Sequence, residues 1–333
     1  MDMSTHQSRT FVVVGTCALS ALLTTYAGCS SSSDTPPAPI DAARDVQYIT
    51  PFDANTPVAC DPHKPFGPPV LVAGVSPVNL GGVSLSPDEL TIYLANQTSG
   101  PYRIYAATRA KVTDDFGALA PVIPVNSQTT TYDDYDPSIT GDNKTLYFSS
   151  SRGVAGSSGG PDLFAAAHDP STGAFQTPVV LPPAVNSNTE ERVPTLSHDQ
   201  RTLYFGSNRD AGTYHVYQSA VSGGTYDPAI VVPLGDTTGD GSPVVTSDEL
   251  TLFFNSSRTG SQNSDIWVAS RPAKPGVFGA PTNQGDVTAV NSASNDYPAW
   301  LSVDGCRLYL TSDRPVGDSG AATPSIYLAT RPE

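Results

Sequence analysis

Positive charge is scarce in this sequence, and so are the motifs of most enzymes. Lys and Arg number 17 against 32 Asp and Glu, which gives a formal net charge of −15 at pH 7. A chain with this charge repels phosphate backbones, so we expect no nucleic-acid partner. The sequence contains no H-E-x-x-H and no glycine-rich phosphate loop. These absences argue against the usual metalloprotease and nucleotide-binding sites.

Long apolar runs are also rare, and the one that stands out lies at the start of the chain. Residues 11–26 are mostly apolar, follow Arg9 and end shortly before Cys29. A basic residue followed by a short apolar segment and small residues is typical of a signal peptide. A span of about 16 residues is too short to cross a bilayer, which needs about 20. We therefore expect residues 1–28 to be a signal peptide.

The sequence around Cys29 resembles the lipobox of bacterial lipoproteins, in which the cysteine thiol is acylated. The resemblance implies a lipid on Cys29 and contact with the membrane through this lipid only. With Ser30 as the following residue, it also implies an outer-membrane lipoprotein of the bacterial envelope. Residues 29–65 are rich in Ser and Pro and cannot bury a core, so we expect a flexible tether.

Five copies of one repeat fill residues 66–333. The copy P-T-L-S-H-D-Q-R-T-L-Y-F-G-S-N-R at 194–209 is matched closely at 137–152 and 243–258, and more loosely at 83–95 and 298–314. Turn aspartates mark the copies at intervals of 49 to 57 residues: Asp88, Asp142, Asp199, Asp248 and Asp304. Each copy contains four β-rich segments separated by turn residues. The pattern predicts an all-β fold, a five-bladed β-propeller of four-stranded antiparallel blades.

The repeated motifs S-x-D-x-x-x-L-Y-F-x-S-x-R and D-I-Y resemble the WD40-like β-propeller repeats of bacterial envelope proteins, including the TolB type. The resemblance covers residues 66–333 and implies the propeller fold. It does not fix a function, because that family includes protein-binding and sugar-associated members. A kelch-type propeller is the alternative fold, with a similar period but a different order of glycine and aromatic residues.

The fifth repeat lacks a fourth strand, which we expect the N-terminal segment to supply. The sequence reaches Glu333 just after the third strand of this repeat. The segment that begins at Phe66 resembles the fourth strand that begins at Phe116 in the first repeat. An N-terminal strand that completes the last blade would remove an open sheet edge.

The four cysteines support the same closure. Cys17 leaves with the signal peptide and Cys29 is the lipid site, so Cys60 and Cys306 remain. In an oxidising compartment we expect this pair to form a disulfide, with two free thiols as the alternative.

Acidic residues precede the inner strands of repeats two to five. They are Asp133, Asp134, Asp136, Glu190, Glu191, Asp240 and Asp296. Because these loops converge on one mouth of a propeller channel, we expect Asp134, Glu191, Asp240 and Asp296 to face a common opening. Such a rim would bind a cation, for which calcium is best suited, or a basic group of a partner. The alternative is that the acids only solvate their loops. No other cofactor is expected.

Arginines follow the second strand of the same four repeats: Arg152, Arg209, Arg258 and Arg314. Asp162 and Asp265 begin third strands nearby, so we expect charge-assisted hydrogen bonds that hold the blade turn. Repeats three and five carry His215 and Ser325 there, so this pairing cannot be general. His198 fills a turn position that differs in every repeat, and we interpret it as structural or solvent-exposed.

The leading functional hypothesis is a non-catalytic binding module of the envelope that presents its propeller mouth to a protein or glycan. The alternative is a glycoside hydrolase, because some five-bladed propellers cleave sugars with carboxylates in the central funnel. Such enzymes need two acids about 5 Å or about 6.5 to 9.5 Å apart. No repeat carries a distinctive single acid, which disfavours this alternative. A structural calcium site is compatible with the first hypothesis.

Overall fold

A computed structural model describes residues 60–333 except for 76–78, 99, 130, 154–159, 211, 236–238 and 317–322. The expected signal peptide, the Cys29 lipid site and most of the tether lie outside the described residues, so the statements made about them above remain predictions. The regular elements of the described residues are the strands β1 to β21, and no helix there is long and apolar enough to cross a membrane.

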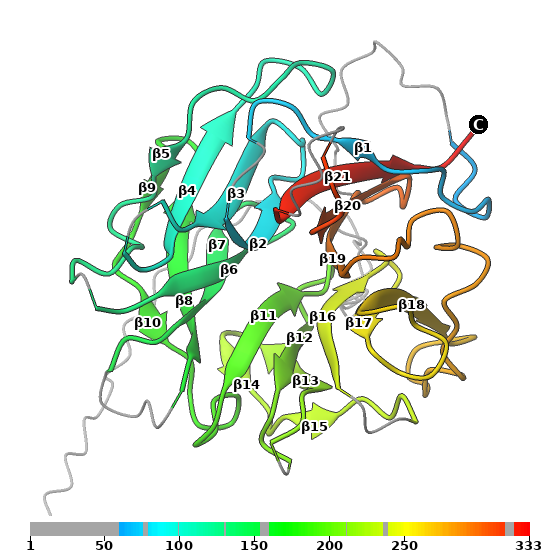
Figure 1. The fold of residues 1–333 in the computed structure, drawn as a ribbon. Coiled ribbons are helices and arrows are strands. Elements are labelled where there is room, and N and C mark those ends of the chain that lie inside the picture. Colours follow the sequence, from blue (N-terminus) through cyan, green and yellow to red (C-terminus); the bar gives the residue numbers. More distant parts are fainter. Residues whose placement is uncertain are drawn as a thin grey trace, which may run out of the picture. The chain divides into compact units, whose positions relative to one another are not determined.

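The strands form five antiparallel sheets, which are the blades of a five-bladed β-propeller (Figure 1). Blade 1 contains β2 (Leu80–Leu85), β3 (Thr91–Asn96), β4 (Arg103–Thr108) and β5 (Ala120–Pro121). Blade 2 contains β6 (Asp134–Ile139), β7 (Thr145–Ser150), β8 (Asp162–Asp169), β9 (Ala174–Phe175) and β10 (Val179–Val180). Blade 3 contains β11 (Glu191–Leu196), β12 (Thr202–Ser207), β13 (His215–Ser222), β14 (Thr225–Tyr226) and β15 (Ile230–Val231).

Blade 4 contains β16 (Asp240–Val245), β17 (Thr251–Ser256) and β18 (Asp265–Ser270). Blade 5 contains β19 (Asp296–Leu301), β20 (Arg307–Ser312), β21 (Ser325–Thr330) and β1 (Val70–Leu71). Blade 4 departs from the expected four strands, because only an isolated bridge between Val268 and Thr282 stands in the place of its fourth strand. The predicted all-β fold with five blades is confirmed.

The inner strands β2, β6, β11, β16 and β19 form the centre of the ring. Each of them packs beside the inner strands of both neighbouring blades, and β19 of the last blade packs beside β2 of the first. The inner strands begin at one end of the central channel, here called the strand-start end. They finish at the opposite end, called the turn end, where each runs into a tight turn.

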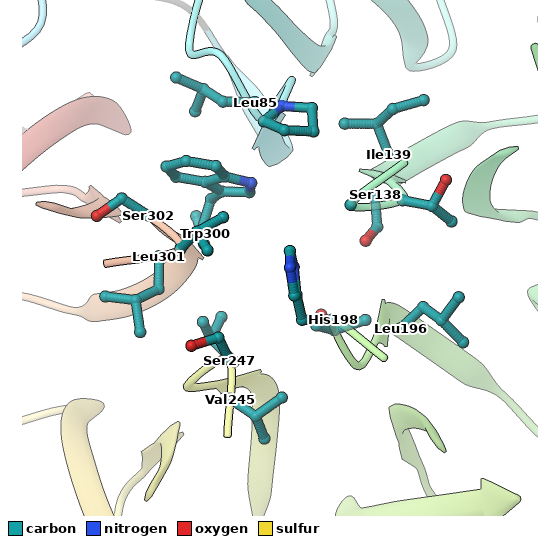
Figure 2. Close-up of a pocket in the computed structure, with 17 residues that line it drawn as sticks. Leu85, Ser138, Ile139, Leu196, His198, Val245, Ser247, Trp300, Leu301 and Ser302 are labelled. Carbon is teal, nitrogen blue, oxygen red and sulfur yellow. The ribbon is translucent and has the colours of Figure 1, made fainter. Parts of the chain in front are cut away.

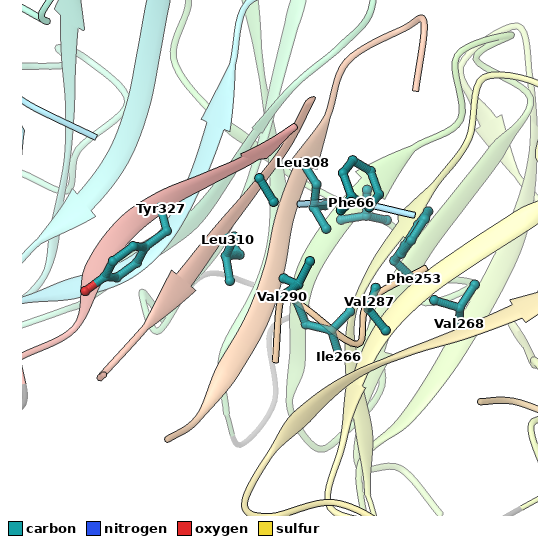
Figure 3. Close-up of a cluster of buried hydrophobic side chains, with 11 residues drawn as sticks. Phe66, Phe253, Ile266, Val268, Val287, Val290, Leu308, Leu310 and Tyr327 are labelled. Atoms are coloured by element: carbon teal, nitrogen blue, oxygen red, sulfur yellow. The ribbon is translucent and has the colours of Figure 1, made fainter. Parts of the chain in front are cut away.

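The predicted N-terminal closure is confirmed. Strand β1 pairs antiparallel with β21, with Val70 opposite Leu328 and Leu71 opposite Tyr327. Phe66, just before β1, is 2% exposed and packs between blades 4 and 5 (Figure 3). The chain therefore closes its ring with a strand that precedes the first blade, and the last blade has no open edge at this position.

A disulfide joins Cys60 to Cys306, with the two Cα atoms 6.0 Å apart. This is the pair that the sequence analysis predicts. Cys306 follows the tight turn of blade 5, so the disulfide fastens the segment before β1 to the turn end of the last blade. It links parts of the chain 246 residues apart.

Hydrophobic packing between neighbouring blades explains why the middle strands carry Leu-Tyr-Phe. In β12, five consecutive residues from Leu203 to Ser207 are buried, because a blade inside the ring is covered on both faces. Separate apolar clusters fill the spaces between blades, and Figure 3 shows the one that contains Phe253, Ile266 and Leu308. Each fully buried side chain of this size contributes about 1.5–3 kcal/mol.

One turn design recurs in all five blades at the turn end. A Ser or Thr hydroxyl donates to Oδ1 of the aspartate two residues later at 2.5 to 2.7 Å, and the same oxygen accepts a backbone N–H two residues further on. The residue after the aspartate has a positive φ in every blade, 59° at Glu89 for example. The turn aspartates thus stabilise the hairpins of the inner strands.

Candidate functional site

The four acids expected at the channel rim each occupy the first position of an inner strand: Asp134 in β6, Glu191 in β11, Asp240 in β16 and Asp296 in β19. Their side chains are at most 2% exposed. Each is paired with the arginine 18 residues later in its own blade. The acids and the arginines that recur in the sequence are therefore two halves of one structural unit.

Blade 4 shows this unit most completely. Nη2 of Arg258 donates to both carboxylate oxygens of Asp240, at 2.7 and 2.8 Å. Its Nε donates to Oγ of Ser256 at 3.0 Å, and its Nη1 donates to the carbonyl of Leu234 at 3.1 Å. Leu234 belongs to the segment that arrives from blade 3. We call this arrangement of acid, arginine, serine and carbonyl the carboxylate–arginine lock.

The same lock occurs in blades 2, 3 and 5. Each arginine Nε donates to a serine at the end of the second strand, at 2.9 to 3.0 Å, and each Nη2 donates to a valine carbonyl before the inner strand. In these three blades a serine N–H also donates to the acid, at 2.6 to 2.8 Å. The lock joins the start of the inner strand, the end of the second strand and the incoming loop.

These contacts bear directly on the expected cation rim. The four carboxylates are buried and paired within separate blades, so they do not form an open ring of free acids. Among the described residues, no three His, Cys, Asp or Glu side chains are grouped to hold a metal ion. Binding of a cation at the rim stays a prediction, whereas the expected pairing with third-strand acids is wrong in blade 4, where Arg258 contacts Asp240 and not Asp265. A buried carboxylate attracts the nearest guanidinium, and here the antiparallel register supplies one.

A cavity lies at the turn end of the channel, and we call it the turn-end funnel (Figure 2). Its volume is about 80 Å³, and its walls are the last residues of the five inner strands together with the turns that follow them. Apolar side chains from all five blades line it: Leu85, Ile139, Leu196, Val245 and Leu301. Ser138 and Ser247 add hydroxyl groups.

Two residues break the repeat in this funnel. Trp300 occupies a position that is Ser84, Ser138, Thr195 or Val244 in the other blades. His198 stands where the other turns have Pro87, Gly141, Ser247 and Val303. Figure 2 shows the indole and the imidazole directed towards the middle of the opening. The turn-end funnel is therefore asymmetric, with its aromatic groups on blades 3 and 5.

Both side chains are held in place by neighbours. A Cβ atom on Gly141 would lie 2.9 Å from Nδ1 of His198, so the glycine of blade 2 leaves the room that the imidazole occupies. The ring of Trp300 packs edge to face against Tyr309, with centroids 5.8 Å apart. No described residue accepts a hydrogen bond from Nε1 of Trp300, which is half-buried. An indole N–H in such a place is suited to an acceptor brought by a ligand.

The sequence analysis missed this site. It treated His198 as structural or exposed and gave Trp300 no role, although both residues depart from a repeat that was already aligned. In a repeat protein, a position where one blade alone carries a large aromatic or titratable side chain is the signal that would have identified them. An apolar funnel with a few polar groups is the usual chemistry of a binding site.

Comparison with known proteins supports the fold and leaves the function open. No protein-family model matches the chain, and no curated protein matches it. An α-L-arabinofuranosidase from Podospora anserina, solved with cellotriose, has a TM-score of 0.54 at 11% identity, over 83% of this chain and 99% of its own. A family 117 glycoside hydrolase from Zobellia galactanivorans has a TM-score of 0.53 at 10% identity, over 81% and 91%.

The structural neighbours also include a TolB protein from Agrobacterium tumefaciens. It has a TM-score of 0.47 at 18% identity and shares 71% of each chain. At these identities the likeness of the two neighbours with a TM-score above 0.5 concerns the fold alone. Any assignment of function must therefore come from the residues of this chain.

Proposed function

We propose that this protein is a non-catalytic binding module of the bacterial cell envelope, anchored through a lipid on Cys29. Its turn-end funnel receives a side chain of a protein partner. The observation that carries the proposal is the convergence of the two repeat-breaking residues, Trp300 and His198, on one central cavity.

The size of the funnel favours an inserted side chain over a whole small molecule. Pockets that bury a small ligand have volumes of about 300–1,000 Å³, whereas the funnel has about 80 Å³. Interfaces gain much of their affinity from one or two residues that fill such central pockets, and Trp is enriched among these residues. The glycan alternative for this funnel is less well supported because a sugar ring needs more room.

The contacts of the repeated acids favour binding over hydrolysis. A glycosidase needs one carboxylate that holds a proton and a second that stays charged, both facing the substrate. Asp134, Glu191, Asp240 and Asp296 are instead buried beside arginines. This arrangement suits a structural role, and the hydrolase alternative gains nothing from it.

The proposal is tested by capture from envelope extract with the full-length protein, comparing the parent with Trp300→Ala and His198→Ala. We expect a partner that the parent retains and both variants lose. Val179→Ser is the matched control, because Val179 is 68% exposed on the outer strand β10, away from the funnel. Identical capture by all four proteins would rule out the funnel as the binding site. Release of a Cys29→Ala variant from the membrane tests the anchor separately.

A further inference from the structure

One ion pair at the strand-start end differs from the four locks. Asp136 in β6 and Arg192 in β11 belong to neighbouring blades, and Nε of Arg192 donates to Oδ2 of Asp136 at 3.1 Å. The same oxygen accepts from the N–H of Val193 at 3.3 Å and from Oγ of Ser149 at 3.0 Å. The side chain of Asp136 is 6% exposed and that of Arg192 is 36% exposed. The carboxylate is thus held inside, whereas about a third of the Arg192 side chain is exposed.

The backbone is distorted at this pair. Asp136 has a φ of 54° and Val193 a φ of 49°, both at the bulges where the register of β6 and β11 shifts. The corresponding residues of blades 1 and 4, Gly82 and Ser242, have φ values of 107° and 46°, so the left-handed conformation recurs at this position in four of the five blades. A left-handed conformation is rare for a β-branched residue such as Val193 and costs about 1–3 kcal/mol. Bulges of this kind turn a side chain away from the ordinary strand alternation.

The Nε atom and one face of the Arg192 guanidinium contact other residues of the protein. Its Nε is bound to Asp136, and its Cζ lies 4.2 Å from the centroid of the Tyr135 ring. Among the described residues, neither Nη1 nor Nη2 of Arg192 donates a hydrogen bond, whereas the arginine of every lock uses Nη2. The two Nη groups therefore present donors to solvent from a fixed orientation.

The neighbours of Arg192 add an acceptor and aromatic surface. The Tyr214 side chain lies close enough to the Arg192 guanidinium for each to influence the pKa of the other, and the Tyr214 hydroxyl donates to Oε2 of Glu190. Oε1 of Glu190 accepts no hydrogen bond from a described residue. On the other side, the ring of Tyr102 packs edge to face against Tyr135, with centroids 6.1 Å apart. Tyr102 and Tyr214 are half-buried.

The charges decide which ligand fits. An anion drawn to Arg192 would also meet the carboxylates of Asp136 and Glu190, and a cation would meet the guanidinium. A neutral sugar avoids both penalties, because its hydroxyls accept from the Nη groups, donate to Glu190 and leave a C–H face for an aromatic ring. We propose that Arg192, Glu190, Tyr102 and Tyr214 form a second binding site, at the strand-start end, for a neutral carbohydrate. This site lies at the opposite end of the channel from the turn-end funnel.

Isothermal titration of the full-length protein with cellotetraose, maltotetraose, chitotetraose and the anionic trigalacturonate tests the proposal. We expect at least one neutral tetrasaccharide to bind and trigalacturonate not to bind. Arg192→Lys keeps the charge but loses the planar fork, so it should weaken binding at least tenfold. Glu190→Gln should weaken it by a similar factor. Arg201→Ala, which removes an exposed arginine after the turn of blade 3, should leave the affinity unchanged.

Three results would overturn the proposal: no binding of any neutral tetrasaccharide, equal affinity in the parent and Arg192→Lys, or binding of trigalacturonate alone through Arg192. The last result would identify an anion site instead. Thermal unfolding of each variant checks that the fold is retained. A loss of sugar binding that comes with a large drop in Tm would point to misfolding, and the Glu190→Gln comparison would then decide.

Discussion

Two ion pairs at the same end of the channel differ in how completely they are bonded. In blade 4, the side chains of Arg258 and Asp240 are 6% and 2% exposed and share two contacts of 2.7 and 2.8 Å. Between blades 2 and 3, the side chains of Arg192 and Asp136 are 36% and 6% exposed and share one contact of 3.1 Å. The first pair uses its hydrogen-bonding groups inside the blade, and the second leaves donors facing solvent.

The two ion pairs also differ in how often they occur among the five blades. The lock is present in four blades, so whatever it does is needed in each of them, and holding the strands together is such a need. The pair of Arg192 and Asp136 occurs once, and so do His198 and Trp300 at the turn end. A structural device can repeat in every blade of the ring, whereas residues that occur only once are the candidates for a single ligand site. The predictions below test this distinction by changing one member of each pair.

The largest effect is expected from Asp240→Ala. Removing this carboxylate leaves the guanidinium of Arg258 buried without a counter-charge, which costs about 3–5 kcal/mol. Urea unfolding of the parent and the variant measures the difference. The double variant Asp240→Leu with Arg258→Met removes both charges and should recover much of the loss. A cost below about 1 kcal/mol for Asp240→Ala would show that the lock is not a stabilising unit.

The next effect concerns the disulfide, which closes the ring at the turn end as the locks tie the strands at the other end. Cys60→Ser should lower the free energy of unfolding by about 2–5 kcal/mol, because the unfolded chain loses a long cross-linked loop. Unfolding of the parent with and without reductant provides an independent check. If reduction leaves the urea midpoint unchanged, the β1 strand and Phe66 hold the closure without covalent help.

Alanine substitutions of Arg192 and Asp136 should lower the free energy of unfolding by smaller amounts, which differ between the two residues. Asp136→Ala removes the acceptor of Val193 N–H and of Ser149 inside the ring, and it should cost about 1–3 kcal/mol. Arg192→Ala leaves the buried Asp136 carboxylate with two hydrogen-bond donors but no counter-charge, so it should cost about 2–3 kcal/mol, less than the roughly 3–5 kcal/mol of a fully buried pair. In the blade 4 lock, by contrast, either single substitution should be severe. Equal costs for Asp136→Ala and Arg192→Ala, both above about 3 kcal/mol, would place this pair with the locks.

The repeat accounts for the parts of the fold that could be predicted. Five turn aspartates set the number of blades, and the segment near Phe66 could be matched to the strand near Phe116 before any coordinates were known. The disulfide between Cys60 and Cys306 follows when Cys17 and Cys29 are set aside for the signal peptide and the lipid that the sequence leads us to expect. These inferences succeeded because the ring closes. A strand that precedes the first blade can pair only with the incomplete last blade, and this pairing brings Cys60 near Cys306.

The partners of the acids could not be predicted in the same way. Asp240 and Arg258 are 18 residues apart, as are the other three pairs, but the contact depends on the hairpin register that sets Asp240 opposite Ser256. The inner strands also contain bulges, and one extra residue moves every later side chain to the other face. Asp136, the partner of Arg192, lies in such a bulge, and the residue types around it do not predict the bulge.

Glu89 is another buried acid with arginine partners. Here the effect of burial on the pKa outweighs the opposing effect of the arginines. Glu89 follows the turn of blade 1 and accepts from Nε of Arg307 in blade 5 at 2.7 Å and from the Tyr309 hydroxyl at 3.2 Å. Burial raises the pKa of Glu89, although Arg307 and Arg109 act to lower it. Burial and the nearby Glu89 carboxylate raise the pKa of Tyr309 to about 12, so this hydroxyl stays neutral.

The raised pKa of Glu89 means that the folded protein binds this proton more tightly than the unfolded chain does. The contribution of Glu89 to stability is therefore complete below its unfolded pKa of about 4.3 and is lost as the pH rises through the higher folded value. Glu89→Gln cannot titrate and serves as the reference. We expect the free energy of unfolding of the parent, relative to this variant, to fall as the pH is raised above about 4.5. A rise above that pH would show that the arginines outweigh the loss of hydration, and would place Glu89 among the stabilising pairs with Asp240.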